Sequence, residues 1–169
     1  EAVLRAHGAV YERLDWDVLL RRTVKWLAAE RVVGWFQGRM EFGPRALGNR
    51  SILGDPRSPR MQSVMNLKVK FRESFRPFAP VVLRENAADY FELDMASPYM
   101  LIVAPLRPDL RRPVMPGLQG LARLAAVRSS LPAVTHVDDS ARIQTVSREQ
   151  NPPLYDLLQC WRAATGCAV

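Results

Sequence analysis

Apolar positions recur with helical spacing in three segments of the chain, residues 12–30, 58–69 and 151–166. In the first, leucines and valines fall on one side of the predicted helix and most charged residues fall elsewhere. Ser58 followed by Pro59 is a typical helix start, and Asn151 before two prolines is another. Gly166 is a typical helix stop. The pattern therefore predicts three amphipathic helices.

Shorter apolar runs rich in β-branched and aromatic residues predict strands. They are residues 31–37 (RVVGWFQ), 51–53, 78–83 and 99–104 (YMLIVA). Residues 133–137 and 141–146 are separated by Asp138, Asp139 and Ser140, which predicts a hairpin. We also expect short helices over 45–48, after Pro44, and over 86–91, and a strand that begins at 167–169.

This mixture of elements predicts the α/β (α+β) class, with an open twisted mixed sheet flanked by helices. A chain of 169 residues that is 48% hydrophobic is long enough for one domain with a core and too short for two large ones. We expect a single domain over 1–169, in which 1–30 is an N-terminal linker and helix. Residues 105–130 contain four of the 13 prolines and are expected to form a long mobile loop.

Positive charge is concentrated between residues 39 and 76. Nine basic residues stand there against three acidic ones, so this segment carries most of the formal net charge of +7. Turn-forming residues are interleaved with them, among them Gly43, Gly48 and Gly54. The glycines permit positive φ or a close approach of the backbone to a ligand. Clustered cations among turns favour an anion-binding site.

Composition narrows the function further. Only three of the 24 basic residues are lysines, and guanidinium groups favour phosphate or carboxylate ligands, although codon bias in a GC-rich genome would also raise the arginine content.

Cys160 and Cys167 have no further Cys or His nearby to complete a metal-ligand set, so two reduced thiols are favoured over a disulfide or a metal site. No apolar run reaches the ~20 residues of a membrane span, and no signal peptide is visible, so we expect a soluble, cytoplasmic protein that does not contact a membrane.

Five blocks of sequence, in order, carry a family resemblance. They are QGRMEFGPRALGNRSILGDPR, MNLKVKFRESFRPFAP, SPYM, PAVTHVDDSARIQTV and a late NP…TG. Together they cover most of residues 33–166, and they resemble the C-terminal domain of the NodU/CmcH class of O-carbamoyltransferases. A match of this length is far more specific than a short motif.

The resemblance implies a YrdC-like fold that makes carbamoyl-adenylate from carbamoyl phosphate and ATP, with Mg²⁺ as the expected companion of ATP. It also implies a partner, an N-terminal actin-like domain, which carries a metal and transfers the carbamoyl group to an acceptor hydroxyl. Nothing like that domain is present in these 169 residues. The family's LNTSFN-type block is absent after residue 169, so we expect a domain truncated at its C-terminus.

The resemblance also implies roles for particular residues. The residues that match the family's contacts to carbamoyl phosphate and the nucleotide phosphates, and are expected to be catalytic, are Arg45, Lys70, Arg76 and Arg142. The expected ligand-binding residues are Arg50, Ser51, Arg72, Gln144 and Thr145. Adenylate formation is carried by positioning and electrostatics, so no nucleophilic side chain and no protein-bound metal is expected.

A structural interpretation stands beside each role. The four cations could be surface groups or ion-pair partners of Glu41, Glu73 or Asp138. Arg50 and Ser51 could share a phosphate or stabilise a turn, the side on which Arg72 lies depends on the local backbone, and Gln144 and Thr145 could simply line a strand.

Two other features also have two interpretations. The phenylalanines at 71, 75 and 78 could stack on adenine, but their spacing is more typical of a core. His136 with Asp138 forms an H-x-D pair, yet two ligands do not make a metal site, and a strand histidine is more often structural.

Three functional hypotheses follow. The first is a carbamoyl-adenylate-forming module of an O-carbamoyltransferase. The second is an RNA- or nucleotide-binding YrdC-like module, which a pI near 10.1 would suit, although no basic motif with interleaved aromatic residues favours nucleic acid. The third is an inactive fragment that retains only the fold.

Overall fold

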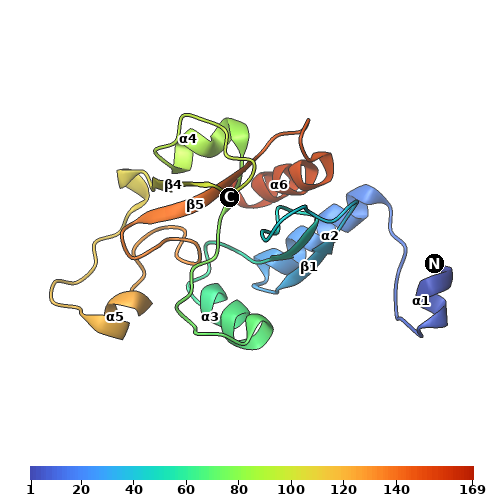
Figure 1. Cartoon of the computed structure of the whole chain (residues 1–169), viewed down its shortest axis with the longest axis horizontal. Helices are drawn as coiled ribbons and strands as arrows, with labels where there is room; N and C mark the ends of the chain where they lie inside the picture. The colour runs from blue at the N-terminus through green and yellow to red at the C-terminus, as the bar shows by residue number, and fades with distance from the viewer.

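Five short strands form two separate sheets. The computed structural model describes all residues from Glu1 to Val169 (Figure 1). In the first sheet β1 (Val33–Phe36) pairs antiparallel with β2 (Arg50–Leu53). The second sheet has the order β3-β5-β4 and contains β3 (Val81–Leu83), β4 (Ile102–Pro105) and β5 (Ser140–Val146). The α/β class predicted from the pattern is confirmed, but the strands make two small sheets.

The central position in the second sheet belongs to β5. It pairs parallel with β3, with Val82 opposite Thr145, and antiparallel with β4, with Val103 opposite Arg142. Six of its seven residues are buried, and only Arg142 is exposed. Although the strand is paired on both edges, its sequence SARIQTV mixes apolar residues with buried polar ones, of which Gln144 and Thr145 are hydrogen-bonded.

Two long helices cover the sheets. Helix α2 (Trp16–Ala28) contacts α6 (Pro152–Thr165), and the two share an apolar core cluster that includes Leu27, Leu157 and Trp161. The Asn151 side chain accepts a hydrogen bond from the Leu154 amide and caps α6, which ends at the left-handed Gly166. The sequence therefore predicted this helix together with both of its ends.

Helix α3 (Met61–Met65) continues directly into a π-helical turn, η1 (Asn66–Lys70), so the helix predicted over 58–69 is confirmed, but it begins at Met61 after Arg60 and the predicted cap at Ser58 is wrong. The turn ends at Phe71, whose φ of 49° is left-handed. The shorter elements are α1 (Ala2–Ala6), η2 (Arg84–Asn86), α4 (Ala87–Tyr90), η3 (Pro108–Leu110) and α5 (Gly120–Ala125). The last two lie within the segment expected to be a loop, which therefore contains one short α-helix.

Two local predictions are wrong. Residues 45–48 form bends instead of a helix, because Gly48 takes a φ of 106° and the Leu47 amide bonds to the Glu41 side chain. Residues 133–137 form turns instead of one strand of a hairpin. There the Thr135 hydroxyl donates to the Leu131 carbonyl, which is local side-chain bonding that competes with a strand ladder. The partners of β5 are instead β3 and β4.

The residues at 167–169 are buried. The Leu83 amide of β3 donates to the Ala168 carbonyl at 3.2 Å, and the Trp161 indole donates to the Val169 carbonyl at 2.9 Å. Val169 belongs to the core cluster under the β3-β5-β4 sheet, and Ala168 belongs to the cluster around α2 and α6. These residues therefore tie both core clusters together, although they are not part of a regular strand.

Candidate anion-binding site

The glycine-containing loop between β1 and β2 is folded around one carboxylate. Oε1 of Glu41 accepts hydrogen bonds from the backbone amides of Leu47 at 2.7 Å, Asn49 at 2.8 Å and Arg50 at 3.2 Å. Burial raises the pKa of the Glu41 carboxyl, but these amide bonds outweigh it and leave the pKa below its ordinary value. Glu41 is therefore a charged internal anchor of the loop that carries Arg45.

Two further side chains hold the same loop. Arg50 donates to the carbonyls of Gln37 at 2.7 Å, Asn49 at 2.9 Å and Gly38 at 3.1 Å, and its guanidinium lies 3.4 Å from the ring centroid of Phe36. The Gly48 amide donates to the Ser51 hydroxyl at 3.0 Å. Arg50 and Ser51 thus bond to the loop itself, and direct contact with a ligand stays a prediction for both.

Strand β5 meets this loop through Gln144. Its Nε2 donates to the Leu47 carbonyl at 2.8 Å, although the two residues are 97 positions apart. Arg142 lies two residues earlier on the strand and so points to the same face as Gln144. Thr145 points to the opposite face, where its hydroxyl accepts from the Ser97 amide at 2.8 Å. The fold therefore brings the loop of Arg45 and the face of Arg142 together, with Thr145 facing away.

The other predicted residues gather around a fully buried amide, Asn66. Its Nδ2 donates to the carbonyls of Ser74 at 3.0 Å and Arg76 at 2.8 Å, and its Oδ1 accepts from Arg72 Nε at 2.6 Å. Asn66 therefore folds the KFRESFR segment back onto the helix that precedes it, with Lys70 at the end of η1. No hydrogen bond or ion pair joins this group to the loop of Glu41.

The four predicted catalytic cations differ in their surroundings. Arg76 pairs with Glu73 at 2.8 Å on the surface. Arg45, Lys70 and Arg142 have no ion-pair partner, and Nε of Arg45 is buried without any hydrogen-bond partner. Buried polar atoms are nearly always satisfied, so an unpartnered guanidinium nitrogen in a basic loop suits an anionic ligand such as phosphate.

The three phenylalanines considered for adenine stacking also differ in their surroundings. Phe71 and Phe75 are exposed, whereas Phe78 packs against the core and lies 5.0 Å from the guanidinium of Arg72. Arg72 is thus fixed between an amide oxygen and an aromatic ring. This arrangement positions the KFRESFR segment, and contact of Arg72 with a ligand stays a prediction.

His136 lies in a turn beside β5, not in a strand. Its Nδ1 is 3.3 Å from the Ser140 hydroxyl, and that hydroxyl donates to Asp138 at 2.7 Å. Burial lowers the pKa of His136, opposed by Asp138 and assisted by Arg142. Nowhere in the 169 residues do three or more His, Cys, Asp or Glu side chains group closely enough to hold a metal ion.

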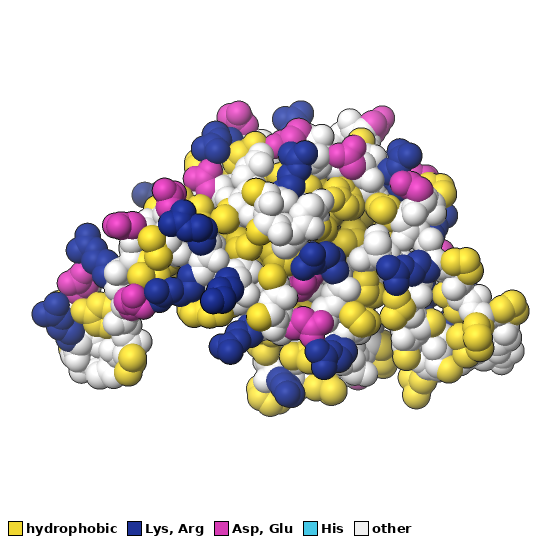
Figure 2. All heavy atoms as spheres, turned by 180° about the vertical axis from the view of Figure 1, so that it is seen from behind, with side chains coloured by type: hydrophobic (Ala, Val, Ile, Leu, Met, Phe, Trp, Pro, Cys, Tyr) yellow, Lys and Arg dark blue, Asp and Glu magenta, His cyan; other side chains and the backbone are white.

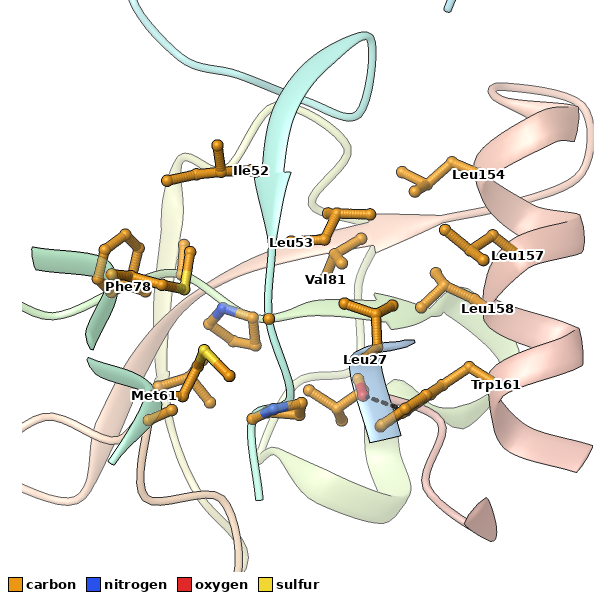
Figure 3. Close-up of a pocket in the computed structure, with 18 residues that line it drawn as sticks. Leu27, Ile52, Leu53, Met61, Phe78, Val81, Leu154, Leu157, Leu158 and Trp161 are labelled. Carbon is orange, nitrogen blue, oxygen red and sulfur yellow. Dashed lines mark hydrogen bonds between the residues drawn. The ribbon is translucent and has the colours of Figure 1, made fainter. Parts of the chain in front are cut away.

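A cavity of about 110 Å³ lies between the two sheets and is apolar. Figure 3 shows Ile52 and Leu53 of β2 facing Leu154, Leu157 and Trp161 of α6 across it. None of the nine predicted site residues lines this cavity. A cavity without charged lining groups does not suit a phosphate, so we assign no role in anion binding to it.

The surface is basic without a single continuous patch on the face seen in Figure 2, where Lys and Arg side chains are interspersed with Asp and Glu around exposed hydrophobic atoms. No helix in the structure combines the length and the apolar character needed to cross a membrane. Both free thiols are present as such, with Cys167 buried and Cys160 partly buried.

A family profile described as Carbamoyltransferase C-terminus matches residues 24–169, which is most of the chain. The chain therefore belongs to this family of carbamoyltransferase domains, and the resemblance seen in the five sequence blocks is confirmed.

Several individual proteins are similar in sequence to this chain. The chain is 60% identical over 164 residues to an uncharacterized protein of Synechocystis sp., covering 95% of this chain and 27% of that protein. It is 42% identical to the nodulation protein NolNO of Sinorhizobium fredii, covering all of this chain and 23% of the relative. It is 41% identical to the 3'-hydroxymethylcephem-O-carbamoyltransferase of Streptomyces clavuligerus, with 85% and 24% covered. The chain thus spans about a quarter of the length of these curated relatives.

Some residues of this site were missed by the sequence analysis. Glu41 entered it only as a potential ion-pair partner, and Asn66 did not enter at all. The available signal for Asn66 was an amide side chain between Met65 and Leu67 in an apolar helical segment. For Glu41, no spacing rule distinguishes a carboxylate that binds amides in a loop from one that faces solvent.

Proposed function

We propose that this chain is the part of an O-carbamoyltransferase that forms carbamoyl-adenylate. Water attacks the carbonyl carbon of carbamoyl phosphate, the bond between that carbon and the phosphate oxygen breaks, and carbamate and inorganic phosphate are formed. A carbamate oxygen then attacks the α-phosphorus of ATP, the bond to the bridging oxygen breaks, and pyrophosphate leaves. Transfer to an acceptor hydroxyl would take place in an N-terminal actin-like domain with its own metal.

Membership of the carbamoyltransferase family, together with the unpartnered Arg45, supports this proposal. The reaction gathers several negative charges in one place, and the chain offers Arg45, Lys70 and Arg142 without carboxylate partners. Each such contact typically stabilises the transition state by about 2–4 kcal/mol. In this proposal Arg76 exchanges its surface partner Glu73 for phosphate, and Mg²⁺ is held mainly by the phosphate oxygens.

Isotope exchange tests the proposal. We expect the intact protein that contains this chain to exchange labelled pyrophosphate into ATP only when carbamoyl phosphate is present, and Arg45→Ala or Lys70→Ala to abolish the exchange. Arg13→Ala is the matched control, because Arg13 is an exposed arginine near the N-terminus that pairs with Glu1. Unchanged exchange in both site variants would contradict the assignment of these residues.

Calorimetry with ATP separates binding from chemistry. Binding should saturate at one site and should weaken in the Arg45 variant. An RNA-binding module would instead show affinity for RNA that falls steeply with salt over many phosphate contacts. Salt-sensitive RNA binding without ATP binding would favour that second hypothesis.

A further inference from the structure

We propose that Glu41 is a positioning residue, whose ionised carboxylate fixes the loop that presents Arg45 to the phosphate-bearing ligand. This inference rests on the proposed function, since it assigns to Glu41 a role in the same site. It adds a residue that touches no ligand and acts through the backbone of its own loop.

The first argument is geometric. One carboxylate oxygen of Glu41 receives the amides of Leu47, Asn49 and Arg50 at 2.7–3.2 Å. The bond to Leu47 closes a ring over residues 41–47, and Arg45 lies inside that ring. The backbone of Arg45 is therefore held by an acidic side chain, in a segment with no helical or strand bonds of its own.

The second argument concerns the surroundings of the loop. Arg50 donates a hydrogen bond to the Gln37 carbonyl at the start of the loop, and Ser51 accepts one from the Gly48 amide near its end. Gln144 of β5 donates to the Leu47 carbonyl. Neither Arg39 nor Arg45 of this braced loop forms a side-chain hydrogen bond, but Arg39 is exposed, whereas Nε of Arg45 is buried. A fixed backbone with a free guanidinium is the arrangement that preorganised anion binding requires.

The third argument is electrostatic. A carboxylate near a phosphate site would repel the ligand unless its charge were neutralised. Three amide dipoles aimed at the Glu41 oxygen neutralise it in place, much as a backbone nest does for a bound anion. Charge-assisted hydrogen bonds of this kind are about twice as strong as neutral ones, so the ionised form of Glu41 is the one that holds the loop.

The pH dependence has a defined sign. The pKa of Glu41 in the folded protein is below its ordinary value, so its contribution is present above the unfolded pKa of about 4.3. That contribution is lost as pH falls through the folded pKa. At neutral pH the loop is therefore held, and acid releases it.

Amide resonances test the loop itself. In the parent protein we expect the amide protons of Leu47, Asn49 and Arg50 to titrate together, with one midpoint below about 4.3. In Glu41→Gln that common transition should be absent, while it should persist in the control Glu12→Gln, whose carboxylate is exposed and pairs with Arg22. Three independent titrations, or none in the parent, overturn the proposal even if Glu41→Gln does not fold.

Ligand affinity tests the positioning role. We expect Glu41→Gln to weaken ATP binding about ten- to a hundredfold, because small misplacements of a binding group are costly. Binding is measured well below both melting temperatures, and that of Glu41→Gln should be lower than that of Glu12→Gln, because a neutral amide accepts weaker hydrogen bonds from the loop than a carboxylate does. In the background of Arg45→Ala, Glu41→Gln should cause no further loss of affinity, since residues that act through one another are not additive.

The outcomes separate the two proposals. Equal affinity in parent and Glu41→Gln, or additive losses with Arg45→Ala, would overturn the inference and leave the proposed function standing. No ATP or carbamoyl phosphate binding by the parent protein would overturn the proposed function and, with it, the role assigned here to Glu41.

Discussion

At the scale of single residues, side chains that bond to the backbone decide the path of the basic loop. Gly48 is one of the few positions where only glycine fits. Its φ is 106°, and a Cβ there would lie 2.4 Å from Cδ2 of Leu154 on α6. The sequence indicated that this segment forms turns, because it contains several glycines and a proline. It did not indicate the close approach of α6, because Leu154 is 106 positions away.

Substitution of Gly48 tests this close packing. We expect Gly48→Ala to lower the free energy of unfolding by roughly 1–3 kcal/mol, through backbone strain and the clash with Leu154. Urea unfolding measures the change. Gly34→Ala is the matched control, since φ there is ordinary and no atom lies within 4 Å of the added Cβ, so its stability should stay close to that of the parent. Equal stability of the two variants would show that the loop does not pack against α6.

At the scale of elements, the helices with clear start and stop signals were predicted well, and the short irregular segments were not. Helix α6 has an asparagine cap, prolines in its first turn and a terminal glycine, all of which act locally. Residues 133–137 are apolar enough for a strand, yet hydroxyl groups of Ser129 and Thr135 bond within the segment. Whether such a segment joins a sheet depends on which edges are free, and that is not a local property.

Asn151, which caps α6, also bonds to residues outside the helix, so its loss should lower the stability of the protein measurably. Asn151 Oδ1 accepts from the Leu154 amide at 3.2 Å and from Gln37 Nε2 at 2.6 Å, and its Nδ2 donates to Asn49 at 3.3 Å. We expect Asn151→Ala to cost about 1–2 kcal/mol of stability in urea unfolding.

A second substitution isolates the oxygen of this side chain. Asn151→Asp keeps the acceptor for the helix amide and for Gln37, but it loses the bond to Asn49 and places a carboxylate oxygen beside Asn49 Oδ1. We expect it to retain most of the stability that Asn151→Ala loses. An aspartate variant as unstable as the alanine variant would show that the cap is not the main contribution.

At the scale of the whole molecule, two core clusters meet through residues near the end of the chain. Cys167 and Val169 belong to one cluster and Ala168 to the other. The amide of Ala168 donates to the Tyr90 hydroxyl at 2.9 Å, and its carbonyl accepts from Leu83. Thus three residues connect both sheets with α6.

Removal of residues 167–169 tests this connection. We expect the loss of at least about 3 kcal/mol in the free energy of unfolding, because a buried valine side chain and several backbone hydrogen bonds disappear together. Removal of residues 1–10 is the control, since all ten are exposed, and should change stability by no more than about 0.5 kcal/mol. If both deletions have the same small effect, the two clusters do not depend on this segment.

The sequence by itself determined the α/β class, the three main helices, the approximate positions of all five strands and the concentration of arginine among turns, because these depend on local periodicity, caps and charge. It also determined the family, through blocks that span most of the chain. Only the tertiary structure decided that the strands form two sheets, that Gln144 meets the basic loop and that Glu41 is enclosed by backbone amides. Those features depend on contacts between residues far apart in sequence and on the direction of individual hydrogen bonds, neither of which is encoded in a local pattern.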